Sequence, residues 1–282
     1  MHTLIWLLIW RGLIFENMPE IKGYNFSNRK SEHLQLPKEL SEASGLSFNR
    51  AGHLLCHDDE QGVIYEIDYR TGNILKRFFI GKTLVHRADL EGIAVKLDTI
   101  FMVNSSGNIL RFLPGKDKEK VAFQTFKTPL ALSNDVEGLT YDPVTDCLLL
   151  ACKGVAQVEA RNPAPADQRA VYAFSLKTYK LLPQPRFLIS IAKITASTKE
   201  KEFAPSAIER HPRTGHFFVL AARGNAMVEL DAAGNLLGVS SLPKSLHPQP
   251  EGLAIAADGT LVICNEGGAK GKPGRLVVYS PR

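Results

Sequence analysis

The sequence predicts an all-β fold: a β-propeller of five blades, each with four antiparallel strands. Three observations predict it: a motif that recurs about every 46 residues, a strand-turn-strand pattern within each repeat, and strand-like segments at both chain ends that together complete one blade. Long helices do not alternate with the strands, so the pattern excludes the α/β classes. A ring of six blades is the alternative.

The recurring motif places a small residue, usually glycine, at the start of a strand. Its five copies are EASGLSF (42–48), DLEGIAV (89–95), DVEGLTY (135–141), APSAIER (204–210) and QPEGLAI (249–255). The small residues are 47, 46, 69 and 45 positions apart, a period typical of propeller blades. The longer interval predicts an insertion, with a loop rich in Pro and Ala at 155–167 and a short helix within 189–202.

Each motif is followed by a turn and then by a short apolar run, which predicts the second strand of the blade. The turns are Asn49–Gly52, Asp142–Asp146, His211–Gly215 and Ala257–Gly259. The apolar runs are Leu54–Cys56, Ile100–Val103, Leu148–Leu150, Phe217–Leu220 and Leu261–Ile263. Third strands alternate apolar and polar residues, as in Val63–Asp68, and a further glycine turn leads into the fourth strand.

The last repeat supplies only three strands after Gly252. The segment Leu34–Leu40 before the first motif matches Ser241–Leu246 before the last motif, so both are expected to end a fourth strand. We therefore expect an N-terminal strand to complete the last blade. Closing the ring in this way satisfies edge hydrogen bonds that would otherwise promote aggregation.

Composition bounds the class of protein. The chain has 282 residues, of which 44% are hydrophobic, and a net charge of +5, so a packed core is expected. The nearest basic run, Lys116–Lys120, alternates in sign, which argues against nucleic acid as a partner. The four cysteines form no CxxC pair and are expected to be small buried residues. We expect a monomer.

Residues 1–22 differ in composition from the rest of the chain. The stretch MHTLIWLLIWRGLIF is apolar but shorter than the ~20 residues that a spanning helix needs. It lacks a basic n-region and a small-residue cleavage site, and Met18 offers an internal start. The segment is therefore either signal-like or anchor-like, with membrane association through it, or a start-site artefact. Residues 23–282 are expected to form one propeller domain.

The first strand of each propeller blade runs along the central channel, so the motif residues should meet there. Converging carboxylates repel one another unless a cation compensates them, and calcium accepts six to eight oxygen ligands with flexible geometry. We therefore expect calcium as the cofactor, with Glu91, Glu137, Glu251 and Asp135 among its ligands. A structural alternative is that each acid only caps a turn. This expectation rests on two positions of the five motif copies. The first position holds Glu42, Asp89, Asp135, Ala204 and Gln249. The third position holds Ser44, Glu91, Glu137, Ser206 and Glu251.

A second set of polar residues follows the second strands and should flank the same channel mouth. Asp59 and Glu266 are further candidate metal ligands, with a solvated turn as the alternative for the run at 58–60. Lys153 and Arg223 are candidates for binding an anionic small molecule such as a phosphate ester, because a metal with basic side chains suits phosphoryl groups. Rim charges without such a role are the alternative for these two, and no catalytic residue is assigned.

The combined motifs resemble a known family. The segments DDEQGVIYEID (58–68), DLEGIAV (89–95), NSSGNILRF (104–112), NDVEGLTYDPVTDCLLLACKG (134–154), PSAIERHPRTGHFFVL (205–220) and PQPEGLAIAADGTL (248–261) are similar to the SdiA-regulated, calcium-regulated β-propellers of bacterial envelopes. The resemblance covers about residues 30–282. By motif position it implies that Glu91, Glu137 and Glu251 are channel acids, with Asp59 and Glu266 nearby. The chain departs from the pattern at Ser44, Ser206 and Ala207.

The resemblance implies a calcium-binding propeller located in the cell envelope, periplasmic or membrane-associated, with a cytoplasmic location as the alternative. It also implies a binding or signalling role with phytase-like hydrolysis of phosphate esters. Two other functions stay open: a non-catalytic interaction scaffold, for which the insertion at 155–168 is the candidate surface, and a lactonase-like metal-dependent hydrolase. The fold alone does not choose among them.

Overall fold

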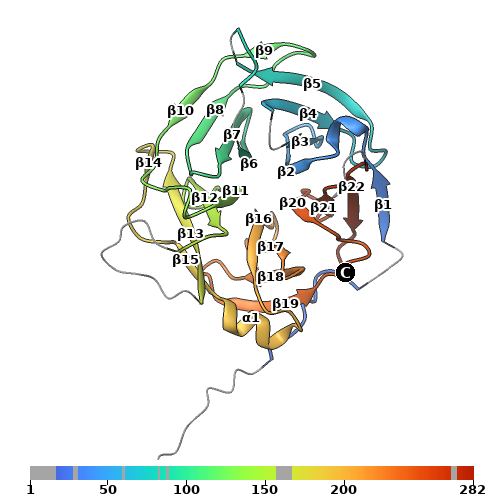
Figure 1. The fold of residues 1–282 in the computed structure, drawn as a ribbon, viewed down its shortest axis with the longest axis vertical. Helices are drawn as coiled ribbons and strands as arrows, with labels where there is room; N and C mark the ends of the chain where they lie inside the picture. Colours follow the sequence, from blue (N-terminus) through green and yellow to red (C-terminus); the bar gives the residue numbers. More distant parts are fainter. Residues whose placement is uncertain are drawn as a thin grey trace, which may run out of the picture.

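The computed structural model describes residues 17–27, 31–58, 61–81, 83–86, 89–156, 167–267 and 272–282. Over these residues the strands form five separate sheets arranged in a ring, so the five-bladed propeller is confirmed and the six-bladed ring is excluded (Figure 1). The innermost strands contact one another in the order β2, β6, β11, β16, β20 and back to β2. These strands span Ala43–Phe48, Leu90–Lys96, Val136–Asp142, Ala204–Arg210 and Pro250–Ile255.

The blades follow the chain in order, and each sheet is antiparallel from its inner strand outward. Blade 1 adds β3 (Leu54–Asp58), β4 (Val63–Ile67) and β5 (Ile74–Ile80) to β2, and blade 2 adds β7 (Thr99–Asn104), β8 (Ile109–Phe112) and β10 (Gln124–Phe126) to β6. Blade 4 adds β17 (Phe217–Arg223), β18 (Ala226–Leu230) and β19 (Leu236–Ser241) to β16.

Blade 3 carries the insertion. Beyond β11 it contains β12 (Cys147–Cys152) and β13 (Gln168–Ser175), and both β14 (Lys180–Leu181) and β15 (Phe187–Ser190) pair with β13. The predicted short helix is α1 (Ile191–Ser197), whose first turn is capped by Ser190, which accepts a hydrogen bond from the backbone N–H of Lys193. Most of the predicted insertion loop, residues 157–166, lies outside the described residues.

The last blade is closed by the N-terminal segment, as predicted. β20, β21 (Leu261–Asn265) and β22 (Arg275–Tyr279) are joined by β1 (Glu32–Gln35), and Leu34 lies opposite Leu276 in the antiparallel register. A short 3-10 helix, η1 (Lys38–Leu40), then leads into β2. The first and last strands of the described chain therefore meet in one sheet (Figure 1).

The hydrophobic core is divided into five clusters, one at each interface between neighbouring blades. The apolar residues on the face of each sheet therefore pack against the neighbouring blade, and the described residues form no single central core. The cluster between blades 4 and 5 includes Ile21, Tyr24 and Phe26. Residues 18–22, which the sequence grouped with the N-terminal segment, thus pack on the propeller, and residues 1–16 lie outside the described part.

One strand was not expected from the sequence. β9 (Lys120–Val121) pairs in parallel with β5 on the outer edge of blade 1, although it lies between two strands of blade 2 in the chain. It covers an edge that would otherwise be open.

Candidate functional site

The inner strand of every blade contains a register irregularity at the same position of the motif. Pairing with the neighbouring strand passes over one residue just before the small residue, and in blade 1 over Gly45 as well. Such bulges turn a side chain out of its normal alternation. The five residues in this position are Ser44, Glu91, Glu137, Ser206 and Glu251.

The two serines of this set join neighbouring blades. The Ser44 hydroxyl donates a hydrogen bond to the backbone carbonyl oxygen of Glu91, at 3.2 Å, and the Ser206 hydroxyl donates one to the carbonyl oxygen of Pro250, at 2.7 Å. Both serines are buried. They therefore hold the inner strands of successive blades together, whereas glutamates occupy the same position in the other three blades.

Glu91 and Glu137 lie on adjacent inner strands, and their carboxyl groups interact. Burial raises the pKa of Glu91 far above its ordinary value, and the negative charges of Glu137 and Asp89 raise it further. Glu137 is only 6% exposed, and burial raises its pKa as well. The two carboxyl groups therefore lie side by side, and the charge of Glu137 makes ionisation of Glu91 less favourable.

Lys153 supplies the positive charge at this place. Its Nζ lies 2.6 Å from Oε1 of Glu137 and 4.0 Å from Oδ2 of Asp135. Burial alone would lower the pKa of Lys153, but the hydrogen bond and charge of Glu137 outweigh it, so the net pKa is raised and the ammonium stays charged. One ammonium thus compensates a group of several carboxylates.

Glu251 reaches the same group from blade 5. Burial, followed by the charges of Glu137 and Glu266, raises the pKa of Glu251 to about 8, and Lys153 opposes that rise. Gln249 donates a hydrogen bond through Nε2 to Oε2 of Glu266 and also bonds to Glu251. The predicted candidates Glu91, Glu137, Glu251, Asp135 and Glu266 therefore lie close enough to influence one another electrostatically.

One predicted site residue is not described, and another is not joined to this group. Asp59 lies outside the described residues. Arg223 is exposed at the end of β17, opposite Ala204 in the register, and in the described part of the chain nothing links it to the three glutamates. Lys153, predicted to bind an anionic small molecule, pairs with the carboxylate of Glu137.

The donor chemistry at the mouth suits a hard cation, because carboxylate oxygens are what calcium prefers. In the arrangement present, however, the described residues contain no group of three or more His, Cys, Asp or Glu side chains placed so as to hold a metal ion. The ammonium of Lys153 lies against the carboxylate of Glu137, where a bound cation would need to be. The carboxylate oxygens are therefore the right type of ligand for calcium, but in this arrangement they are spaced around the ammonium of Lys153.

Sequence reasoning missed the role of Lys153 and a further acid, Glu209. The pairing register of β11 with β12 could have located Lys153. Its backbone N–H donates a hydrogen bond to the carbonyl oxygen of Asp135 at 2.7 Å, which extends the β11–β12 ladder to the channel mouth. Glu209 lies near the far end of β16, where its Oε1 accepts hydrogen bonds from the Thr140 hydroxyl at 3.2 Å and the Arg210 N–H at 3.0 Å. Burial raises its pKa to about 8.

Three solved structures of enzymes are similar to this chain in fold. The glutaminyl cyclase of Myxococcus xanthus matches with a TM-score of 0.56 at 13% identity, over 89% of this chain and 94% of that one. An aldose sugar dehydrogenase of Streptomyces coelicolor matches with a TM-score of 0.56 at 15% identity, over 90% of this chain and 99% of that one. A luciferin-regenerating enzyme matches with a TM-score of 0.55 at 10% identity, over 89% and 95%. At these identities the likeness shows the fold alone.

No curated protein matches the chain by sequence. A family model, by contrast, matches residues 41–268, which include the inner strands of all five blades and the three channel glutamates. The chain therefore belongs to the SdiA-regulated family.

Proposed function

We propose that the channel mouth of this propeller binds a calcium ion between Glu91, Glu137 and Glu251. One observation carries the proposal: bulges in three inner strands direct three glutamates toward one place, where the described residues supply a single ammonium, that of Lys153. Carboxylates that repel one another in a partly desolvated place gain the most from a divalent cation.

Calcium is favoured over other metals by the donor atoms. Glutamate oxygens carried on three separate inner strands can adjust their distances, which suits the flexible coordination of calcium better than the strict octahedron of magnesium. Cys264 lies near enough to feel the charge of Glu251, but it is fully buried and burial raises the pKa of its thiol well above the ordinary value, which argues against zinc. Lys153 would have to leave Glu137 when the metal binds.

A binding or signalling role is favoured over hydrolysis of phosphate esters. A phosphoryl-transfer site needs free cationic groups around the metal. Here Lys153 is held by Glu137, and Arg223 is exposed and apart from the three glutamates. We propose a role in the cell envelope, which stays a prediction. In the described part of the chain, no helix has the length and apolar character needed to cross a membrane.

Calorimetric titration with calcium tests the proposal directly. We expect the wild-type protein to bind one calcium ion. Glu137→Gln and Glu251→Gln should each bind it at least about tenfold more weakly, because each replaces a charged ligand with a neutral side chain of nearly equal size. Glu39→Gln, an exposed substitution in η1, is the matched control and should leave the affinity unchanged. Magnesium at the same concentration should compete poorly.

Two results would count against calcium binding. If the wild-type protein shows no heat of binding and an unchanged melting temperature with and without EDTA, the channel carboxylates serve only the fold. If calcium binds with equal affinity to the wild type and both glutamine variants, the ion lies elsewhere. Hydrolysis of a panel of phosphate esters or lactones in the presence of calcium would overturn the preference for a binding role without affecting the metal site.

A further inference from the structure

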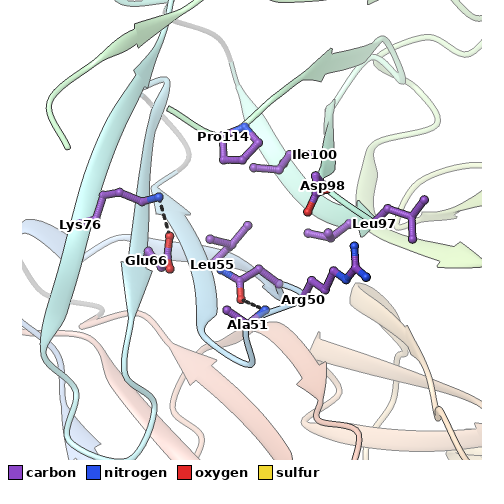
Figure 2. A pocket seen from close by; sticks show the side chains of 11 residues that line it. Arg50, Ala51, Leu55, Glu66, Lys76, Leu97, Asp98, Ile100 and Pro114 are labelled. Carbon is purple, nitrogen blue, oxygen red and sulfur yellow. Dashed lines mark hydrogen bonds and ion pairs between the residues drawn. The ribbon is translucent and has the colours of Figure 1, made fainter. Parts of the chain in front are cut away.

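A pocket of about 380 Å³ lies between blades 1 and 2, at the opposite end of the inner strands from the channel glutamates. The glutamates occupy the N-terminal starts of the inner strands, whereas the pocket is formed around their C-terminal turns. Its lining is shown in Figure 2. The residues are Asn49, Arg50, Ala51, Leu55, Glu66, Lys76, Val95, Leu97, Asp98, Ile100 and Pro114.

The pocket exists because the inner hairpin of blade 2 is short. Its turn contains only residues 97–98, between Lys96 of β6 and Thr99 of β7. In the other blades the corresponding turns span 49–53, 143–146, 211–216 and 256–260. Leu97 adopts a φ of +55°, a conformation that is unfavourable for leucine, and its side chain is 68% exposed. A strained turn thus presents a leucine at the pocket rim, and such strain often marks functional sites.

The floor of the pocket is apolar. Leu55 and Ile100 are each 2% exposed in the whole molecule and belong to the cluster between blades 1 and 2. Pro114 and Ile100 lie on one side of the space in Figure 2, and Leu55 lies near its centre. An apolar group of a ligand would therefore find aliphatic contacts here.

The charged residues of the pocket differ in whether they already have an ion-pair partner. Glu66 is already neutralised, because Lys76 lies 2.9 Å from its Oε2 and His53 lies 2.5 Å from its Oε1. Arg50 and Asp98 come from the two facing turns, and neither has an ion-pair partner among the described residues. In Figure 2 these two side chains lie near Leu97, across the pocket from the Lys76–Glu66 pair.

We propose that this pocket binds a small zwitterion with an apolar body, of the class of aliphatic α-amino acids. The carboxylate of such a ligand would pair with the guanidinium of Arg50, and its ammonium with the carboxylate of Asp98. The two charges of an α-amino acid are adjacent, as Arg50 and Asp98 are on one side of the pocket, and the aliphatic side chain is then directed toward Leu55, Ile100 and Pro114. The site is separate from the channel mouth and does not rest on calcium binding.

Three ligands that share the isobutyl group of leucine test the proposal by saturation-transfer NMR and calorimetry: leucine, 4-methylpentanoate, which lacks the ammonium, and 3-methylbutylamine, which lacks the carboxylate. We expect leucine to bind to the wild-type protein, and each analogue to bind about tenfold more weakly, equivalent to about 1.4 kcal/mol. Arg50→Gln and Asp98→Asn should each weaken leucine binding by a similar factor.

Ala51→Trp provides a second test, because Ala51 is exposed on the rim and a tryptophan there would fill the pocket without disturbing the core. It should abolish leucine binding while leaving the melting temperature and any calcium binding unchanged. Arg213→Gln, on the corresponding turn of blade 4, is the matched control and should bind leucine as the wild type does. Absence of leucine binding, equal binding of leucine and 4-methylpentanoate, or full binding by Ala51→Trp would overturn the proposal.

Discussion

Lys153 Nζ lies 2.6 Å from Glu137 Oε1 at the mouth of the channel, so a side chain of the protein provides the one cation that the group of carboxylates contacts in the described residues. Replacing Lys153 tests whether its ammonium balances the negative charge of the carboxylates at the channel mouth. We expect Lys153→Gln to lower the free energy of unfolding without calcium by about 1–3 kcal/mol, because a partly buried carboxylate loses its partner.

The same variant should bind calcium more tightly than the wild type, since the metal no longer has to displace an ammonium. Melting temperatures measured in EDTA and in calcium separate the two effects. The calcium-induced rise in melting temperature should be larger for Lys153→Gln than for the wild type. A variant as stable as the wild type in EDTA would show that the ion pair contributes nothing, and an unchanged calcium affinity would place the metal away from Lys153.

Gly92 tests the packing of the inner strands. A Cβ at this position would lie 2.7 Å from the backbone nitrogen of Leu139 and 2.9 Å from the carbonyl oxygen of Glu137, both on the next inner strand. Because the obstacle is backbone, the strands would have to separate, and we expect Gly92→Ala to cost about 1–3 kcal/mol of the free energy of unfolding. Gly23→Ala, where nothing lies within 4 Å, is the control. Denaturant unfolding of both variants measures the difference, and equal costs would refute the crowding argument.

Gly92 also illustrates what the sequence could predict. The period of the motif predicted five blades, with six as the alternative, and the matching segments before the first and last motifs located the closing strand. Both signals depend on residues that every blade needs. The small residue of the motif was predicted to permit close approach, and the contacts of Gly92 confirm it. Features shared by all five blades are thus readable from one chain.

Two features that occur in only one blade were not predicted. Nothing local in Lys120–Val121 indicates that it pairs with β5 of the preceding blade, since parallel pairing depends on the path of the loops. The contact between Lys153 and Glu137 required the register of β11 with β12, and a lysine next to a strand end has no distinctive pattern of its own. The metal ligands predicted from the sequence stay a prediction.

Leu34 lies in β1, and its replacement tests the closure of the ring. Leu34→Pro removes a backbone N–H and fixes a ring against the ladder with β22, so we expect it to cost about 3 kcal/mol or more and to promote aggregation through the exposed edge of β22. Leu34→Ala keeps the backbone intact and measures the side chain alone. Thermal unfolding and light scattering compare the two. Proline and alanine variants of equal stability would mean that β1 does not close the ring in solution.

Glu209 gives the protein a predictable dependence on pH. Burial raises its pKa from 4.5 to about 8 in the folded protein, and in the unfolded chain the carboxyl has its ordinary value. Between these two values the unfolded state releases a proton that the folded state keeps, so the stabilisation present below pH 4.5 is lost as pH rises through about 8. The full shift corresponds to a loss of about 5 kcal/mol.

Glu209→Gln should reduce this dependence, because an amide stays neutral and its oxygen can still accept the hydrogen bonds from Thr140 and Arg210. Urea unfolding at a series of pH values from 4.5 to 8.5, carried out in EDTA, measures the slope. The wild type should lose stability more steeply than Glu209→Gln, whereas Glu39→Gln, changed at an exposed site, should follow the wild type. Parallel curves for all three proteins would show that Glu209 titrates alike in the folded and unfolded states, and its carboxyl would then have to be hydrated inside the ring.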